Sequence, residues 1–392
     1  MFRKPYFLKG LVVFFLLHIT YFLILLFSYQ TVPLNKYLYS SGFHYIEDTR
    51  VTYHQFSFLN ALSAWDGQWY YRIAHAGYTT KIETSAHAGH VFLDQYAYAF
   101  LPLYPYTVAF FDILIQNTLL SFFIVSNLIL IALFFTTYYV VSKLYSSKIA
   151  MRTSFLLLFF PLGLFYRTYY SEGLFLLLLL WFSYVLIKRN WWQVCISLAL
   201  LYLTKVNGLF LLIPLSYVLL KEVKDKKLSK IKALAIIIAP FISLTFLYFI
   251  GVLNMNYGFI WIYAHNFWGP KVSVIQNVFN NIQTIFNFVQ LPFHDYKPSK
   301  TEILAFIAGI ILLIKSKKVL RPELWWIAFA LCVTPLFLKN FTSYARYEIV
   351  IFPFFIYLAK RLHGIWYYAT VALFFTGLVW FSIIFLNWGW IE

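Results

Sequence analysis

The 392-residue chain has few charged residues, few cysteines and no polar stretch as long as a soluble domain. Only 11% of its residues are charged and 62% are hydrophobic, whereas soluble domains average about 25% charged and about 45–50% apolar residues. The two cysteines, Cys195 and Cys332, both lie inside apolar segments, which argues against a disulfide framework and a cysteine metal site. These scarcities exclude an ordinary soluble enzyme.

Long apolar runs recur along the whole chain instead. A helix crosses the bilayer core with about 17–25 mostly apolar residues. We therefore expect residues 1–392 to form one all-α polytopic membrane domain with about eleven spans. The predicted spans are Leu8–Phe27, Leu119–Val141, Ala150–Tyr166, Gly173–Ile187, Trp191–Leu203, Leu209–Leu220, Ile231–Leu253, Ile303–Ile314, Leu324–Leu338, Tyr344–Ala359 and Ile365–Leu386.

The basic residues predict the orientation of these spans. The formal net charge is +17, and the Lys and Arg side chains gather in short clusters between apolar runs, as the positive-inside rule describes for cytoplasmic loops. This distribution argues against nucleic acid as a partner. It places the N-terminus in the cytoplasm and the C-terminus outside. The clusters are Lys143–Arg152, Lys188–Arg189, Lys221–Lys232, Lys315–Arg321 and Lys360–Arg361.

Two long loops lie on the predicted outer side, at about 28–118 and 254–301. In the first, apolar residues at helical spacing predict an amphipathic helix over Phe58–Ala76 on the membrane surface. The two prolines of Pro102–Ile115 suit a second, shallow juxtamembrane helix better than a full span. In the second loop, His265, His294 and Asp295 lack the spacing of metal ligands.

One stretch in the first outer loop, Trp65-Asp66-Gly67-Gln68-Trp69-Tyr70, places an acid between two tryptophans. The same topology puts further acids and cations at span ends on the outer side. Carboxylates and cations gathered at one membrane face predict a binding or catalytic site there. The other candidate residues are Arg72, Asp94, Gln95, Tyr104, Arg167, Glu172, Lys205, Asn207 and Arg346.

Each candidate also has a structural interpretation. Asp66 suits a helix cap or an ion pair with Arg72, and Glu172 suits the N-terminus of the span that follows it. The cations on the predicted outer side are also typical of side chains that extend to the membrane surface and bind lipid phosphates. The Trp and Tyr residues suit an interfacial aromatic belt.

Five stretches of the chain form a recognisable set of motifs. They are Trp65–Tyr70 with Gly77-Tyr78, Phe100–Pro105, Phe160-Pro161 with Tyr170–Phe175, Leu203–Gly208, and Ala345–Tyr347 with Phe352-Pro353. These motifs resemble those of the PIG-V family, the glycosyltransferases of GT-C type that add the second mannose in GPI-anchor assembly and that have bacterial relatives. The resemblance covers about residues 60 to 355. Ser171 stands where the family has Thr, and Lys205-Val206 where it has Arg-Pro, which removes a bidentate phosphate ligand.

The resemblance implies a bacterial-type relative that moves a sugar, expected to be mannose, from a polyprenyl- or dolichyl-phosphate donor to a hydroxyl of a lipid or glycan acceptor. Asp66 is the expected general base of an inverting displacement, and protein cations would stabilise the departing phosphate. No cofactor or divalent metal is expected. The residues and the resemblance together give the expected substrate-binding residues, which are Trp65, Trp69, Tyr70, Arg72, Asp94, Gln95, Tyr104, Arg167, Glu172, Lys205, Asn207 and Arg346.

A transporter or flippase of lipid-linked sugars is the alternative of a different class. Such proteins place ionisable groups within their spans and are often built from repeats. Here the spans are nearly free of charge and no internal repeat is evident. A membrane enzyme is therefore favoured, with its active site on the non-cytoplasmic face of the cell membrane in a bacterium or of the endoplasmic reticulum in a eukaryote.

Overall fold

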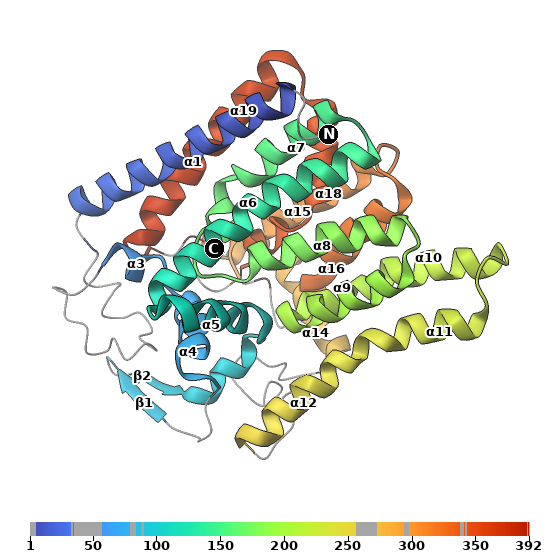
Figure 1. Ribbon diagram of the computed structural model, residues 1–392, viewed down its shortest axis with the longest axis horizontal. Coiled ribbons are helices and arrows are strands. Elements are labelled where there is room, and N and C mark those ends of the chain that lie inside the picture. Colours follow the sequence, from blue (N-terminus) through green and yellow to red (C-terminus); the bar gives the residue numbers. More distant parts are fainter. Residues whose placement is uncertain are drawn as a thin grey trace.

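The computed structural model describes residues 5–32, 34, 57–78, 84–87, 90–255, 273–293, 298–337, 341, 343–389 and 391. Nearly all of its regular structure is helical (Figure 1). The exception is a short hairpin, in which β1 (Thr84–His87) pairs antiparallel with β2 (His90–Leu93) and Thr84 lies opposite Leu93. The prediction of an α-helical protein is confirmed, although no sequence pattern predicted this hairpin.

Five helical segments in the described part of the chain are long and apolar enough to cross a membrane, as expected of a polytopic membrane protein. Each contains one of the predicted spans. They are Tyr6–Thr31 in α1 (Pro5–Thr31), Thr118–Leu144 (α6), Val206–Lys224 (η5, Val206–Leu211, with α10, Leu212–Lys224), Lys230–Leu253 (α11, Lys230–Ile238, η6, Ala239–Phe241, and α12, Ile242–Met255) and Gly364–Leu386 (α19).

The other six predicted spans coincide with helices that are shorter or interrupted. At 1.5 Å per residue, helices of 10–17 residues cover about 15–26 Å, less than the roughly 30 Å of a bilayer core. They are α7 (Ser147–Leu158), α8 (Glu172–Ile187), α9 (Trp191–Thr204), α15 (Lys300–Ser316), α16 (Pro322–Phe337) and α18 (Phe352–Arg361).

Two of these spans were predicted as single helices and are broken. Within 150–166, α7 ends and a 3-10 turn, η4 (Pro161–Tyr166), begins after Phe160, whose ψ of 145° is extended. A residue before proline is pushed out of the helical region, which explains this break. Within 344–359, α17 (Tyr344–Glu348) is separate from α18, which has Pro353 in its first turn.

The predicted surface helix over 58–76 is also wrong as one continuous element. The chain forms α3 (Phe58–Ala61) and α4 (Gly67–Ala76), and Trp65 between them has a left-handed backbone with φ of 58°. The second juxtamembrane helix is present as α5 (Leu103–Ile115).

The elements of the first outer loop gather at one end of the helical bundle. Figure 1 shows α3, α4, α5 and the hairpin at this end, while α1 and α19 run side by side along the bundle. The last residues return to the same end, where the Trp65 indole Nε1 donates to the carbonyl oxygen of Gly389 at 3.4 Å.

The loop over about 254–301, which we predicted to lie on the outer side, contains α14 (Val274–Phe286), followed by η7 (Phe288–Gln290). This helix exposes apolar side chains and buries polar ones. Phe279 and Phe286 are 64% and 82% exposed, whereas the Asn281 amide is buried and donates to the carbonyl oxygens of Pro335 and Leu336. An apolar outer face is typical of a helix that contacts lipid. Much of this loop, with His265, His294 and Asp295, lies outside the described residues.

Gly208 allows the tight turn between α9 and α10. A Cβ at this position would lie 2.9 Å from the backbone carbonyl oxygen of Leu201, which cannot move independently. We expect Gly208→Ala to lower the free energy of unfolding by about 1–3 kcal/mol, measured by denaturant titration in detergent. Gly10→Ala is the matched control, because its Cβ would meet only the flexible end of Met151. Equal losses in the two variants would show that the Leu201 carbonyl does not restrict this turn.

Candidate functional site

Four charged side chains from distant parts of the sequence meet at the start of α4. Arg346 donates from Nη1 to Oδ2 of Asp66 at 2.8 Å, across 280 residues. Its Nε lies 3.2 Å from Oε1 of Glu172, and Lys205 Nζ pairs with the same carboxylate oxygen. We call Asp66, Glu172, Lys205 and Arg346 the charged cluster.

The local backbone on both sides of the cluster is irregular. Asp66 follows the left-handed Trp65, and α17, which carries Arg346, follows Ser343 with φ of 62°. A residue other than glycine with this left-handed backbone destabilises the fold by about 1–3 kcal/mol, and it is found only where the surrounding structure stabilises it. Trp65 is held by its hydrogen bond to Gly389 and by contact with the Trp388 ring at 5.9 Å.

The cluster is neutral as a whole and mostly buried. Glu172 is 1% exposed and Arg346 is 6% exposed. Taking each charge from water costs several kcal/mol, which mutual pairing and hydrogen bonds offset. The side chain of Asp66 is 26% exposed, so it is the carboxylate of the cluster that a ligand can reach.

Asp66 does not have the structural roles that the sequence left open. It occupies the N-cap position of α4, but its side chain makes no capping hydrogen bond. Its ion pair is with Arg346 and not with Arg72, which lies half-buried on α4. Within the described structure its Oδ1 receives no hydrogen bond, so this oxygen is open to a ligand.

Aromatic rings line the cations of the cluster. The Arg346 guanidinium lies 5.4 Å from the ring centre of Tyr170 and 5.6 Å from that of Phe165. Lys205 Nζ lies 4.6 Å from the ring centre of Tyr347. Cation–π contacts of this kind stabilise both cations in the cluster.

Tyr70 links the motif of Asp66 to that of Glu172. Its hydroxyl shares a 2.7 Å hydrogen bond with Ser171 Oγ, and its ring contacts that of Tyr104. Burial, reinforced by the charge of Glu172, raises the pKa of Tyr70 well above its ordinary value. Tyr70 therefore stays neutral and positions the motif.

Several predicted site residues lie apart from the charged cluster. Arg167 is fully buried, donates from Nη1 to the carbonyl oxygens of Leu158 and Gly163 at 2.8 Å, and joins η4 to α7. Trp69 is buried and stacks on Phe100 with ring centres 5.8 Å apart.

Three further predicted residues lie in short 3-10 turns. Asn207 is buried in η5, two residues after Lys205. Asp94 and Gln95 lie in η3 (Asp94–Ala99), where only the backbone is described.

The sequence did not predict that the aromatic rings of Tyr170 and Tyr347 contact the cations of the charged cluster. Tyr170 and Tyr347 lie next to predicted site residues in the motifs Tyr170-Ser171-Glu172 and Ala345-Arg346-Tyr347. Their position beside Glu172 and Arg346 in the sequence is the signal that could have identified them. The contact of Trp65 with Trp388 and Gly389 had no such signal, because it joins residues about 324 positions apart.

Comparison with models of known protein families, with curated proteins and with solved structures finds no match to the chain. The described residues contain no group of three or more His, Cys, Asp or Glu side chains placed to hold a metal ion. The functional interpretation therefore rests on the charged cluster.

Glu172 is expected to be the main electrostatic support of the cluster. Glu172→Gln removes the charge that holds both Arg346 and Lys205, and breaking a buried pair costs about 3–5 kcal/mol of unfolding free energy. Denaturant titration in detergent measures this loss. The control is Arg321→Met, because the Arg321 side chain is 44% exposed and lies 3.9 Å from Glu323, and an ion pair with one partner exposed in this way contributes about 1 kcal/mol or less. A loss in Glu172→Gln no larger than in the control would refute the assignment.

Proposed function

We propose that the chain is an inverting glycosyltransferase of GT-C type that transfers a sugar from a polyprenyl- or dolichyl-phosphate donor to a hydroxyl of a lipid or glycan acceptor. The observation that carries the proposal is the partly exposed Asp66 carboxylate, held on one oxygen by Arg346 and open on the other. By its resemblance to the PIG-V family, the proposed sugar is mannose.

Asp66 acts in this proposal as the general base. As the acceptor oxygen forms its bond to the anomeric carbon, its proton passes to Oδ1 of Asp66. The bond between the anomeric carbon and the phosphate oxygen breaks, and its electron pair leaves with the lipid phosphate. One displacement on one face of the sugar inverts the anomeric centre.

The two cations supply the charge that the departing phosphate needs. Arg346 and Lys205 share Glu172, so the cluster has cations held in place before the donor arrives. Such preorganised charge is worth more in a site from which water is excluded. Glu172 thus acts as a positioning residue for both cations.

The proposed membrane arrangement has eleven crossings, with the charged cluster on the outer side. The five long apolar helices and the exposed apolar face of α14 support the proposal that the chain lies in a membrane. The shorter helices would cross together with the turns that continue them. The side chains of the basic clusters would then lie in the cytoplasm.

Cysteine labelling tests this orientation. In a background without Cys195 and Cys332, Lys148→Cys and Lys226→Cys should resist a membrane-impermeant maleimide in intact cells, whereas exposed Asn280→Cys of α14 should react. Permeabilisation should make all three reactive. Labelling of the first two in intact cells would reverse the proposed topology.

Substitution of the base tests the chemistry. Asp66→Asn should lower the rate of sugar transfer from polyprenyl-phosphate mannose by about 10²–10⁴-fold, the usual contribution of a general base. The assay follows consumption of the donor by the purified protein with candidate acceptors. Asp225→Asn, an exposed acid in the predicted cytoplasmic loop after α10, should keep the wild-type rate. Unchanged transfer in a folded Asp66→Asn protein would remove Asp66 from this role.

A reconstituted system separates transfer from transport. Movement of an intact lipid-linked sugar across vesicles, with no new glycosidic bond, would favour the transporter alternative.

Because the guanidinium of Arg346 already bridges the two carboxylates of the cluster, we expect a chelator to leave the rate of sugar transfer unchanged, measured with and without EDTA. Restoration of a lost rate by one divalent ion would contradict this expectation.

A further inference from the structure

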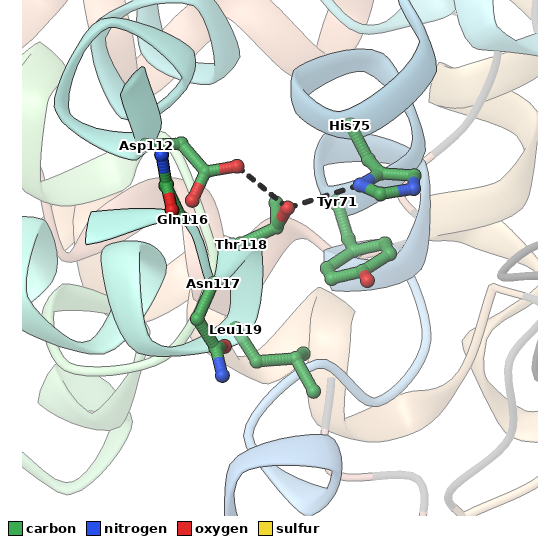
Figure 2. A pocket seen from close by; sticks show the side chains of 7 residues that line it. All are labelled: Tyr71, His75, Asp112, Gln116, Asn117, Thr118 and Leu119. Carbon is green, nitrogen blue, oxygen red and sulfur yellow. Dashed lines mark hydrogen bonds between the residues drawn. The ribbon is translucent and has the colours of Figure 1, made fainter. Parts of the chain in front are cut away.

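A second polar site lies at the far end of α4 from Asp66. It is an open pocket of about 450 Å³ between α4, the end of α5 and the start of α6 (Figure 2). His75 is nine positions after Asp66, which is about 14 Å along a helix, and the charged cluster contributes no residue to the lining. The lining residues are Tyr71, His75, Asp112, Gln116, Asn117, Thr118 and Leu119.

The hydrogen bonds in the pocket determine which groups face a ligand. Thr118 Oγ1 donates to Asp112 Oδ2 at 2.7 Å (Figure 2). Ser121 Oγ lies 2.7 Å from Asp112 Oδ1 and 2.9 Å from the Asn117 carbonyl oxygen, so its one hydrogen is shared between these two acceptors. A hydroxyl has one hydrogen, so Thr118 accepts its second bond, at 3.0 Å, from His75 Nδ1. In the neutral imidazole Nε2 is then an acceptor.

Two amides add donors and acceptors to the same pocket. Asn117 Oδ1 caps α6 by accepting from the backbone N–H of Leu120, which leaves the NH₂ group of this amide to donate elsewhere. Gln116 is exposed and has a left-handed backbone with φ of 54°, where glycine would be less strained. Its amide lies at the pocket edge.

This set of groups fits an uncharged polyol. Among the described residues no Lys or Arg lines the pocket and Asp112 is present, which disfavours a phosphate or another anion. One carboxylate whose two oxygens already accept hydroxyl hydrogens is a poor cation site. The stacked rings of Tyr71 and His75, 5.6 Å apart and inclined by 19°, offer a flat face, and the amides and imidazole match hydroxyl groups.

The surroundings indicate that such a polyol is attached to a lipid. The α5 residues just before the pocket expose their apolar side chains, with Phe110 at 67%, Ile113 at 71% and Leu114 at 81%. In a membrane protein such a face lies against acyl chains. The polar pocket therefore opens beside a lipid-facing surface.

We propose that the pocket of α4, α5 and α6 binds the uncharged, hydroxyl-rich headgroup of a membrane glycolipid. The headgroup hydroxyls bond to His75 Nε2 and the amides of Gln116 and Asn117, while the acyl chains lie along α5. This proposal does not depend on the proposed transferase activity.

Lipid binding to the purified full chain tests it. Native mass spectrometry in detergent compares monohexosyl diacylglycerol with diacylglycerol and with phosphatidic acid. The glycolipid should bind most tightly. Equal binding of diacylglycerol would show that the headgroup is not recognised, and preference for phosphatidic acid would show an anion site. Either result overturns the proposal.

Variants locate the binding. His75→Phe keeps a ring beside Tyr71 but removes both nitrogens, and Asn117→Ser keeps an N-cap oxygen but removes the amide NH₂. Each should weaken glycolipid binding by about fivefold or more, as expected for a lost hydrogen bond, with an unchanged unfolding transition. Wild-type binding by both folded variants overturns the proposal.

Two controls distinguish binding in this pocket from binding at the charged cluster and from binding of a soluble sugar. Asp66→Asn should bind the glycolipid as the wild type does, whether or not it still transfers sugar. Loss of binding only in Asp66→Asn would place the lipid at the charged cluster and overturn the proposal. Free methyl hexopyranoside should compete only weakly, and competition as strong as that of the glycolipid would assign the pocket to a soluble sugar instead.

Discussion

The guanidinium of Arg346 forms ion pairs with two carboxylates, Asp66 and Glu172, in a part of the structure from which water is largely excluded, and the rest of the candidate site depends on this arrangement. Without it, Glu172 would be left with Lys205 alone, and Asp66 would lose the contact that fixes its orientation. Removing one partner from such a buried network leaves a charge uncompensated. The positions of α4, α8, η5 and α17 at one end of the bundle are therefore coupled through one side chain.

The helix interruptions have local causes, and two of them carry members of the charged cluster. The break after Phe160 is explained by the proline that follows it. Lys205 has extended backbone between α9 and η5, and Arg346 lies on the short α17, so both cations of the cluster come from irregular segments. In a membrane, backbone that is not helical is tolerated only where protein surrounds it or where it lines a cavity.

The sequence predicted the helical membrane class and the four members of the charged cluster, because hydropathy and charge distribution report directly on burial in lipid. It failed where a local irregularity overrides periodicity. The apolar spacing of Phe58, Trp65 and Trp69 fitted one helix, but the left-handed Trp65 interrupts it. Arg167 had the same sequence signal as Arg346, and only tertiary packing directs it toward backbone carbonyls. Contacts over hundreds of residues carry no local signature.

The contact of Trp65 with Trp388 and Gly389 also determines when the site can exist during synthesis. The motif of Asp66 leaves the ribosome before Arg346 and before the residues that follow α19. Domains generally form in the order of their synthesis, but here the first acid of the cluster waits for a partner that is made 280 residues later. The charged cluster is therefore completed only after α17 has been made, so a chain truncated before Arg346 would lack it.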